Sequence, residues 1–176
     1  MSFPSAFKSY VPQSHCVDKH SYGTIMVTRD KKLAVVKGRG SGKWGLPKGH
    51  GNGGNEKPLA AAVRETREET GVDLSLVKYD DKITLTSGTY YVYLFDEEQV
   101  LAPEDTKEIS EAKWVSFAEL KGLKMNMDLN TVSYSKLRRL EELLDKIEGT
   151  PVPPNSTPAN AFVAAPSGED PTALKI

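Results

Sequence analysis

The chain has 176 residues, of which 38% are hydrophobic, and its formal net charge is −1. This length and composition suit one folded domain, and the charge excludes a polycation that binds nucleic acid nonspecifically. The single cysteine, Cys16, excludes an internal disulfide and favours a reducing compartment. No apolar run approaches the length of a membrane span, and the N-terminal segment lacks a signal-peptide core. We therefore expect a cytoplasmic or nuclear protein without a membrane partner.

The first predicted elements are two β-rich runs, residues 23–28 and 33–37, joined by a polar turn, which is the pattern of a hairpin. The overlapping segment 31–49 is basic and glycine-rich, and it contains no acid. Glycines allow backbone N–H groups to approach an anion closely, and Lys and Arg side chains supply charge for phosphoryl oxygens. This segment is therefore suited to phosphate. Its cations are Lys31, Lys32, Lys37, Arg39, Lys43 and Lys48.

The next predicted element is a helix that begins near Asn55 and Pro58 and ends at Gly71, with Asn as the cap and Gly as the terminator. Three glutamates lie at i, i+3 and i+4 on one ridge, opposite an apolar stripe, so we expect them to face outward together. A divalent cation would make this crowding tolerable. The alternative is a solvated acidic face. The glutamates are Glu65, Glu68 and Glu69, and the stripe is Leu59, Ala62, Val63, Thr66 and Thr70.

The remaining pattern predicts strands at 73–85, 89–95 and 114–117, a helical turn at 117–120 and a long helix at 131–147. Alternation in the second strand places Tyr91, Tyr93 and Phe95 on one face and the intervening residues on the other. This order implies α/β architecture, with a mixed β-sheet between helices in an α/β/α sandwich. We expect one domain over residues 20–148, an N-terminal extension over 1–19 and a proline-rich, disordered tail over 149–176.

The helix and the loop before it carry a spaced set of charged residues that resembles the Nudix hydrolase signature, G-x5-E-x7-R-E-U-x-E-E-x-G-U. His50 replaces the first glycine and Thr66 replaces an aliphatic residue. The second change is mild, because a Thr66 hydroxyl can bond the carbonyl of Ala62. The matching residues are Glu56, Arg64, Glu65, Glu68, Glu69, Gly71 and Val72.

Further segments extend the resemblance. Residues 21–27, 44–49 and 108–114 are similar to the mRNA-decapping Nudix enzymes. The Pro-Lys-Gly-His sequence at 47–50 resembles diadenosine tetraphosphate hydrolases. The resemblance implies the Nudix fold and a metal-dependent hydrolase that cleaves a phosphoanhydride bond in a nucleotide-linked substrate. Such a substrate is an RNA 5′ cap or a dinucleoside polyphosphate.

The resemblance also implies a role for individual residues. Mg²⁺ or Mn²⁺ is expected on Glu65, Glu68, Glu69 and the Gly49 carbonyl, and Arg64 paired with Glu56 is expected to position the glutamates. The predicted catalytic residues are Glu68, Glu65 and, as first choice of general base, Glu108, with Glu111 as the alternative. The predicted phosphate-binding residues are Lys48, Arg39 and Lys37. Trp44 and Tyr90 either stack on a base or belong to the core.

Two alternatives stay open at the level of sequence. The first keeps the chemistry but takes diphosphoinositol polyphosphates, whose dense phosphates suit the basic segment 31–48. The second is a non-catalytic Nudix module that binds a nucleotide or RNA. Loss of glutamates would favour that module, and none is lost.

Overall fold

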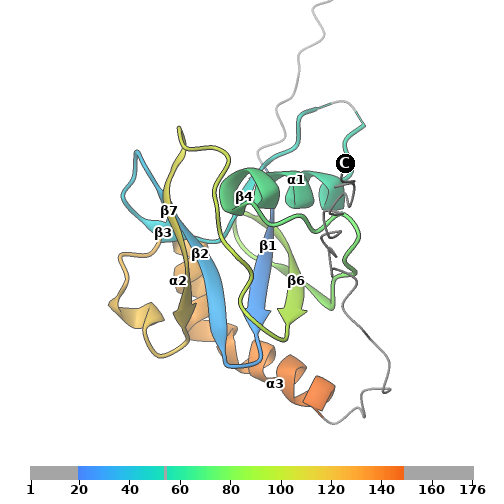
Figure 1. Ribbon diagram of the computed structural model, residues 1–176, viewed down its shortest axis with the longest axis vertical. Coiled ribbons are helices and arrows are strands. Elements are labelled where there is room, and N and C mark those ends of the chain that lie inside the picture. Colours follow the sequence, from blue (N-terminus) through green and yellow to red (C-terminus); the bar gives the residue numbers. More distant parts are fainter. Residues whose placement is uncertain (1–19, 54, 149–176) are drawn as a thin grey trace, which may run out of the picture.

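The computed structural model describes residues 20–53 and 55–148 (Figure 1). The predicted extension and tail lie outside the described residues. No helix in the described part of the chain is long and apolar enough to cross a membrane. The strands are β1 (Ser21–Thr28), β2 (Lys32–Gly38), β3 (Trp44–Gly45), β4 (Lys48–His50), β5 (Asp81–Thr84), β6 (Gly88–Phe95) and β7 (Ile109–Ser116). The helices are α1 (Pro58–Thr70), the 3-10 turn η1 (Leu120–Gly122), α2 (Met127–Ser135) and α3 (Leu137–Glu148).

The seven strands form one mixed sheet in the order β3-β2-β1-β6-β5, with β4 paired to β1 and β7 paired to β2. Strands β1 and β6 run parallel over their full length, from Ser21 opposite Gly88 to Thr28 opposite Phe95. Strands β1 and β2 pair only at the hairpin end. Farther along, the segment 44–50 supplies short partners, with β3 on β2 and β4 on β1. This segment therefore lies at the start of β1.

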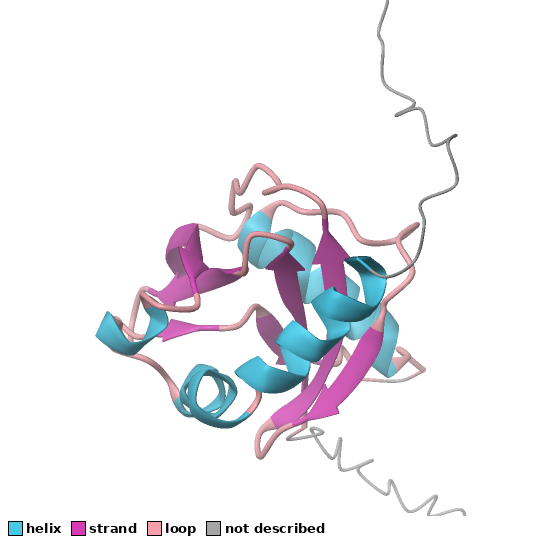
Figure 2. Ribbon diagram, turned by 90° about the horizontal axis from the view of Figure 1, so that it is seen from below, coloured by secondary structure: helices cyan, strands magenta, loops and turns pink. Residues whose placement is uncertain are grey.

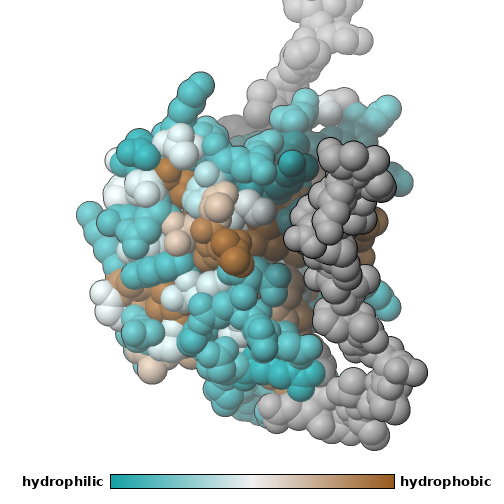
Figure 3. Space-filling model, viewed as in Figure 1, coloured by the Kyte–Doolittle hydropathy of each residue, from teal (hydrophilic) through white to brown (hydrophobic). Residues whose placement is uncertain are grey.

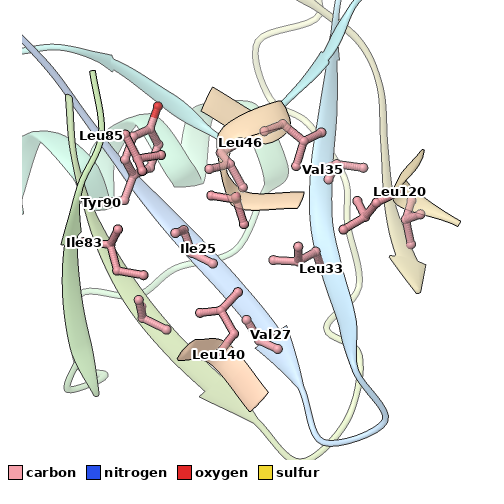
Figure 4. Close-up of a cluster of buried hydrophobic side chains, with 14 of the residues drawn as sticks. Ile25, Val27, Leu33, Val35, Leu46, Ile83, Leu85, Tyr90, Leu120 and Leu140 are labelled. Carbon is pink, nitrogen blue, oxygen red and sulfur yellow. The ribbon is translucent and has the colours of Figure 1, made fainter. Parts of the chain in front are cut away.

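Helices cover both faces of the sheet, as Figure 2 shows. Alternate residues of β1 divide between two cores: Met26 packs with the α1 side, whereas Ile25 and Val27 pack with α2 and α3. Figure 4 shows the second of these cores, in which Leu33, Val35 and Leu140 surround the same interior. On the coloured part of the face in Figure 3, hydrophilic side chains surround smaller hydrophobic patches. The predicted α/β/α sandwich is confirmed, and so is the division of the β6 residues between the two faces.

Helix α1 has the ends that its sequence predicts, with one exception. Pro58 occupies the first turn, and Gly71 closes the helix at φ 77° with its N–H donating to the Arg67 carbonyl at 2.7 Å. A side chain at Gly71 would also lie 2.4 Å from the Ala102 carbonyl oxygen, so only glycine fits there. The N-cap position is Lys57, which makes no side-chain capping bond. The prediction that Asn55 caps the helix is therefore wrong.

The other boundaries differ where tertiary contacts decide them. The strand predicted at 73–85 is reduced to β5, because β6 offers antiparallel pairing only to residues 81–84. The strand predicted at 114–117 is the longer β7, which pairs along β2. The predicted turn at 117–120 is displaced to η1. The helix predicted at 131–147 is two helices, because Lys136 leaves the helical region at φ −120° and ψ −11°.

Candidate active site

The acidic ridge of α1 packs directly on β4. The Lys48 backbone N–H donates to Glu69 Oε2 at 2.9 Å. The Glu65 carboxylate lies against Gly49, where an added Cβ would be 2.0 Å from Glu65 Cδ. Glycine is required at this position because the carboxylate occupies the space of a side chain. Two of the ridge glutamates and the β4 backbone thus form one site.

The three glutamates differ in exposure. Glu69 is only 9% exposed, whereas 16% of the Glu65 side chain and 43% of the Glu68 side chain are exposed. The prediction that all three face outward is therefore wrong for Glu69. Strand β4 covers that part of the helix, and the sequence pattern of α1 contains no information about β4.

Arg64 connects the glutamates to one another. Its Nε donates to Glu56 at 2.9 Å, and one terminal nitrogen donates to Glu65 at 2.8 Å and to Glu68 at 3.2 Å. The other terminal nitrogen donates to the His50 carbonyl at 2.9 Å. The predicted Arg64–Glu56 pair is present, and its hydrogen bond holds the pKa of the Glu56 carboxyl below the usual value. One guanidinium thus fixes the loop, the helix and β4 relative to each other.

Thr66 shows why its departure from the family pattern is tolerated. It is fully buried, and its hydroxyl donates to the Ala62 carbonyl at 2.7 Å, as predicted. The same hydroxyl is 2.8 Å from that of Thr24 on β1. The polar side chain is therefore satisfied, and it ties α1 to the sheet.

Glu65 and Glu69 lie close to other carboxylates, whose negative charges repel theirs. Burial raises the pKa of Glu69 to about 8, the Lys48 N–H opposes that rise, and the charges of Glu65, Glu108 and Asp105 add to it. Burial also raises the pKa of Glu65, with Arg64 opposing. A proton or a cation would relieve this repulsion.

The raised pKa of Glu69 predicts a pH-dependent stability in the metal-free protein. Between about pH 4.5 and pH 8 the unfolded chain has lost the Glu69 proton and the folded chain retains it. The folded state then binds more protons, so the free energy of unfolding falls as pH rises through this window. Thermal unfolding in a chelator at pH 5 and pH 8 measures the effect.

The Glu69→Gln variant is the control for that experiment, because it cannot titrate. We expect its pH slope to be shallower than that of the unmodified chain over the same window. Equal slopes in the two proteins would show that Glu69 ionises normally.

The oxygen ligands suit a hard divalent cation. Among residues 20–53 and 55–148, no group of three or more His, Cys, Asp or Glu side chains is arranged to hold a metal. Mg²⁺, however, is commonly bound by one or two carboxylates, with waters and substrate phosphates completing its shell. Glu65 and Glu69 beside the Gly49 backbone meet this need. Burial is the main reason that their pKa values are raised, and the charges of neighbouring carboxylates, which a cation would offset, add to the rise. Glu68 is the more exposed ligand candidate.

A loop brings further acids to the site. Residues 104 and 105 donate their N–H groups to the Glu68 carbonyl, at 2.9 and 2.8 Å. This docking places Glu108 where its charge raises the pKa of both Glu65 and Glu69. Glu111 lies on β7 opposite Lys37. The effect of the Glu108 charge on both ridge glutamates supports Glu108 as the first choice of general base.

The basic residues of segment 31–48 do not form one surface. Lys31 and Lys32 lie at the hairpin turn, where they pair with Glu141 and with Asp30 and Glu98. Their position at the far end of β1 separates them from β4.

The three residues predicted to bind phosphate have other partners in this structure. Lys48 Nζ contacts Asp128 Oδ2 at 2.8 Å. Arg39 donates to the Thr106 carbonyl at 3.0 Å, and Lys37 Nζ lies 5.6 Å from the centroid of the Trp44 ring. The Lys48 ammonium group already has a buried counter-charge, and phosphate binding by Lys48, Arg39 and Lys37 stays a prediction.

The two aromatic candidates belong to the core. Tyr90 is fully buried, and its hydroxyl donates to Asp128. Trp44 is 6% exposed, and Lys113 Nζ lies 4.4 Å from its ring centroid. Base stacking on either ring is therefore the wrong interpretation of this pair, and packing is the correct one.

Two polar residues near the site, Ser87 and Asp128, were not predicted from the sequence. Asp128 carries a weak signal as a lone acid within Asn126-Met127-Asp128-Leu129, where the neighbours are apolar or uncharged. Its partners lie far away in the chain and cannot be read from that signal.

Comparison with known proteins establishes the family. The NUDIX domain family matches residues 19–136, so this chain belongs to the Nudix family and the predicted resemblance is confirmed. The mRNA-decapping enzyme subunit 2 of Arabidopsis thaliana is 31% identical over 124 residues, which is 67% of this chain and 33% of that protein. The m7GpppN-mRNA hydrolase dcap-2 of Caenorhabditis elegans is 32% identical over 123 residues, 65% of this chain and 14% of that protein. The chain thus spans a third or less of these relatives.

Solved structures show the same fold. The Nudix hydrolase RenU from M. Smegmatis superposes with a TM-score of 0.56 at 17% identity, over 73% of this chain and 88% of that one. The NUDIX domain of Shewanella oneidensis NrtR, complexed with ADP ribose, gives a TM-score of 0.56 at 18% identity. The match covers 75% of this chain and 94% of that one. These similarities confirm the predicted Nudix-type sandwich.

Proposed function

We propose that this protein is a divalent-metal-dependent hydrolase that cleaves a phosphoanhydride bond in a nucleotide-linked substrate. The observation that carries the proposal is the contact between the acidic ridge and β4. There the Glu65 carboxylate lies on Gly49 and Glu69 accepts the Lys48 N–H. Membership of the Nudix family supports the same reaction class.

The chain itself supplies binding, orientation and proton transfer. Bound Mg²⁺ or Mn²⁺ would neutralise phosphoryl charge and lower the pKa of a bound water. Glu65, Glu69 and the Gly49 backbone would hold the ion, with Glu68 as a further ligand. Arg64 keeps Glu65 and Glu68 in place through its fixed set of donors.

Glu108 is our choice of general base. It is exposed to solvent, and its charge acts on the half-buried Glu65 and the buried Glu69. As water attacks phosphorus, its proton would pass to the Glu108 carboxylate while the bond between phosphorus and the bridging oxygen breaks. The leaving phosphate retains the electrons of that bond.

Capped RNA is the first substrate to test, because two relatives are named for mRNA decapping or cap hydrolysis. Dinucleoside polyphosphates contain the same bond and come second. Diphosphoinositol polyphosphates need a broad cationic surface. Lys31 and Lys32 lie at the far end of β1 and pair with Glu141 and Glu98, which disfavours such a surface at the site. Retention of every ridge glutamate disfavours a module that only binds.

The test is a panel of capped RNA, diadenosine polyphosphates and diphosphoinositol polyphosphate, each with Mg²⁺ or Mn²⁺. We expect metal-dependent hydrolysis of a nucleotide-linked substrate, with products resolved chromatographically. Glu69→Gln protein purified in parallel excludes a contaminating hydrolase, because it should release product at least about a hundredfold more slowly. Failure to hydrolyse any of the three classes would favour the binding module instead.

A further inference from the structure

A buried polar cluster lies next to β4, outside the ridge of glutamates. Asp128 is 1% exposed, and its Oδ2 atom accepts from Lys48 Nζ at 2.8 Å and from the hydroxyls of Ser87 and Tyr90. Lys48 Nζ also donates to Ser87 Oγ at 2.7 Å. These residues come from α2, from β4, from the turn between β5 and β6, and from β6. The cluster therefore joins four parts of the chain at one atom.

Lys48 is the link between this cluster and the candidate active site. Its side chain contacts Asp128, while its backbone N–H donates to Glu69 at 2.9 Å. The Glu65 carboxylate packs against the next residue, Gly49. A shift of Lys48 would therefore move two groups that surround the proposed metal.

Strand β4 needs an anchor, because its own pairing is slight. It has three residues, and within the described part of the chain its one strand partner is β1, through Ser21, Tyr22 and Gly23. On the other side of the segment, the Asn126 N–H donates to the Trp44 carbonyl at 2.8 Å, and the Asn126 amide fills the space above Gly45. The start of α2 thus holds β3 through Asn126 and β4 through Asp128.

The charge of Asp128 depends on Lys48. Its second oxygen, Oδ1, is buried and has no hydrogen-bond partner among the described residues. Burial raises the pKa of Asp128, but the hydrogen bonds from Lys48, Ser87 and Tyr90 outweigh it and hold that pKa below its usual value. Lys48 supplies the only cation among these donors, so the carboxylate and the ammonium restrain each other.

We propose that Asp128 is a positioning residue for the hydrolytic site, acting through Lys48 to fix β4 against Glu65 and Glu69. Among the described residues, the Asp128 carboxylate accepts hydrogen bonds from the side chains of Lys48, Ser87 and Tyr90, and none of these side chains is a ligand of the proposed metal. The inference rests on the proposed function for its kinetic effect. Its effect on β4 is independent of turnover.

The first test is amide hydrogen exchange of the full chain at the Lys48 N–H, followed by NMR. In Asp128→Asn the amide keeps the shape but loses the charge, and we expect exchange at Lys48 to accelerate about tenfold or more. Asp81→Asn is the matched control, since it breaks an ion pair with Arg139 at 2.7 Å on β5. Unchanged exchange in Asp128→Asn, or an equal change in Asp81→Asn, would overturn the proposal.

The second test is kinetic. With the substrate that the panel identifies, Asp128→Asn should lower kcat about 10- to 100-fold, as outer-shell changes do, with KM altered less than about twofold. A rise in KM at constant kcat would assign Asp128 to substrate binding and contradict its positioning role.

A double-mutant cycle tests whether Asp128 affects kcat through Lys48 or independently of it. If Asp128 acts through Lys48, then Lys48→Met combined with Asp128→Asn should lower kcat little more than either change alone. Additive losses would refute the link. Should Asp128→Asn fail to fold, Ser87→Ala removes one donor of the cluster and takes its place in both tests. If the unmodified chain hydrolyses none of the substrates, the proposed function fails. The hydrogen-exchange result at Lys48 still shows whether Asp128 holds β4 in place.

Discussion

Replacing Glu69 with glutamine is expected to lower kcat by at least about a hundredfold and to leave the fold intact. Glutamine retains an oxygen that can accept the Lys48 N–H, so the contact with β4 survives. It loses the negative charge that a divalent cation needs. Because burying that charge raises the pKa of Glu69 to about 8, its removal should also keep or raise the thermal midpoint of the metal-free protein at pH 8.

Glu68→Gln should show the same loss of turnover with almost no change in thermal midpoint, because 43% of the Glu68 side chain is exposed. Steady-state hydrolysis and thermal unfolding of both variants measure the two effects. Glu104→Gln is the control, an exposed acid paired with Arg67 on the same helix. Near-normal turnover of either ridge variant in Mg²⁺ would refute the assignment of these glutamates as metal ligands.

The second large effect is expected at Arg64. Arg64→Lys preserves the charge but cannot bridge Glu56, Glu65 and the His50 carbonyl with one ammonium group. We expect kcat to fall about 10- to 100-fold, as for other residues that orient metal ligands. The free energy of unfolding should fall by about 1–3 kcal/mol, because hydrogen bonds to charged groups are lost.

The matched control is Arg67→Lys, one turn along α1, where 58% of the Arg67 side chain is exposed and its partner is Glu104. Denaturant unfolding and steady-state kinetics of the two variants can be compared directly. If Arg67→Lys changed both quantities as much as Arg64→Lys, the network around Arg64 would have no special role.

The local sequence pattern was sufficient to predict those elements whose determining residues lie close together in the chain. The hairpin of β1 and β2 follows from two apolar runs around a polar turn. The end of α1 follows from Gly71, which adopts the left-handed conformation that glycine permits. The predicted Thr66 hydrogen bond to Ala62 also formed, because its partner is one helical turn away.

Prediction failed where a distant partner decides the outcome. The segment 73–80 has apolar residues but stays outside the sheet, and Leu76 is 98% exposed. The partner of Lys48, Asp128, lies 80 residues farther along the chain, so no local pattern could indicate the ion pair. Tyr90 seemed able to stack on a base, but its hydroxyl belongs to the same buried cluster.

The sequence by itself determined the Nudix family, the α/β/α architecture and the spacing of Glu65, Glu68 and Glu69 on one helix, because periodicity and local turn chemistry act within a few residues. Only the tertiary structure decided which of these glutamates is buried, where the loop carrying Glu108 docks and what Lys48 contacts. Burial, charge repulsion and ion pairing depend on the distance between atoms in space. Segments far apart in the chain set those distances, and here they meet at β4.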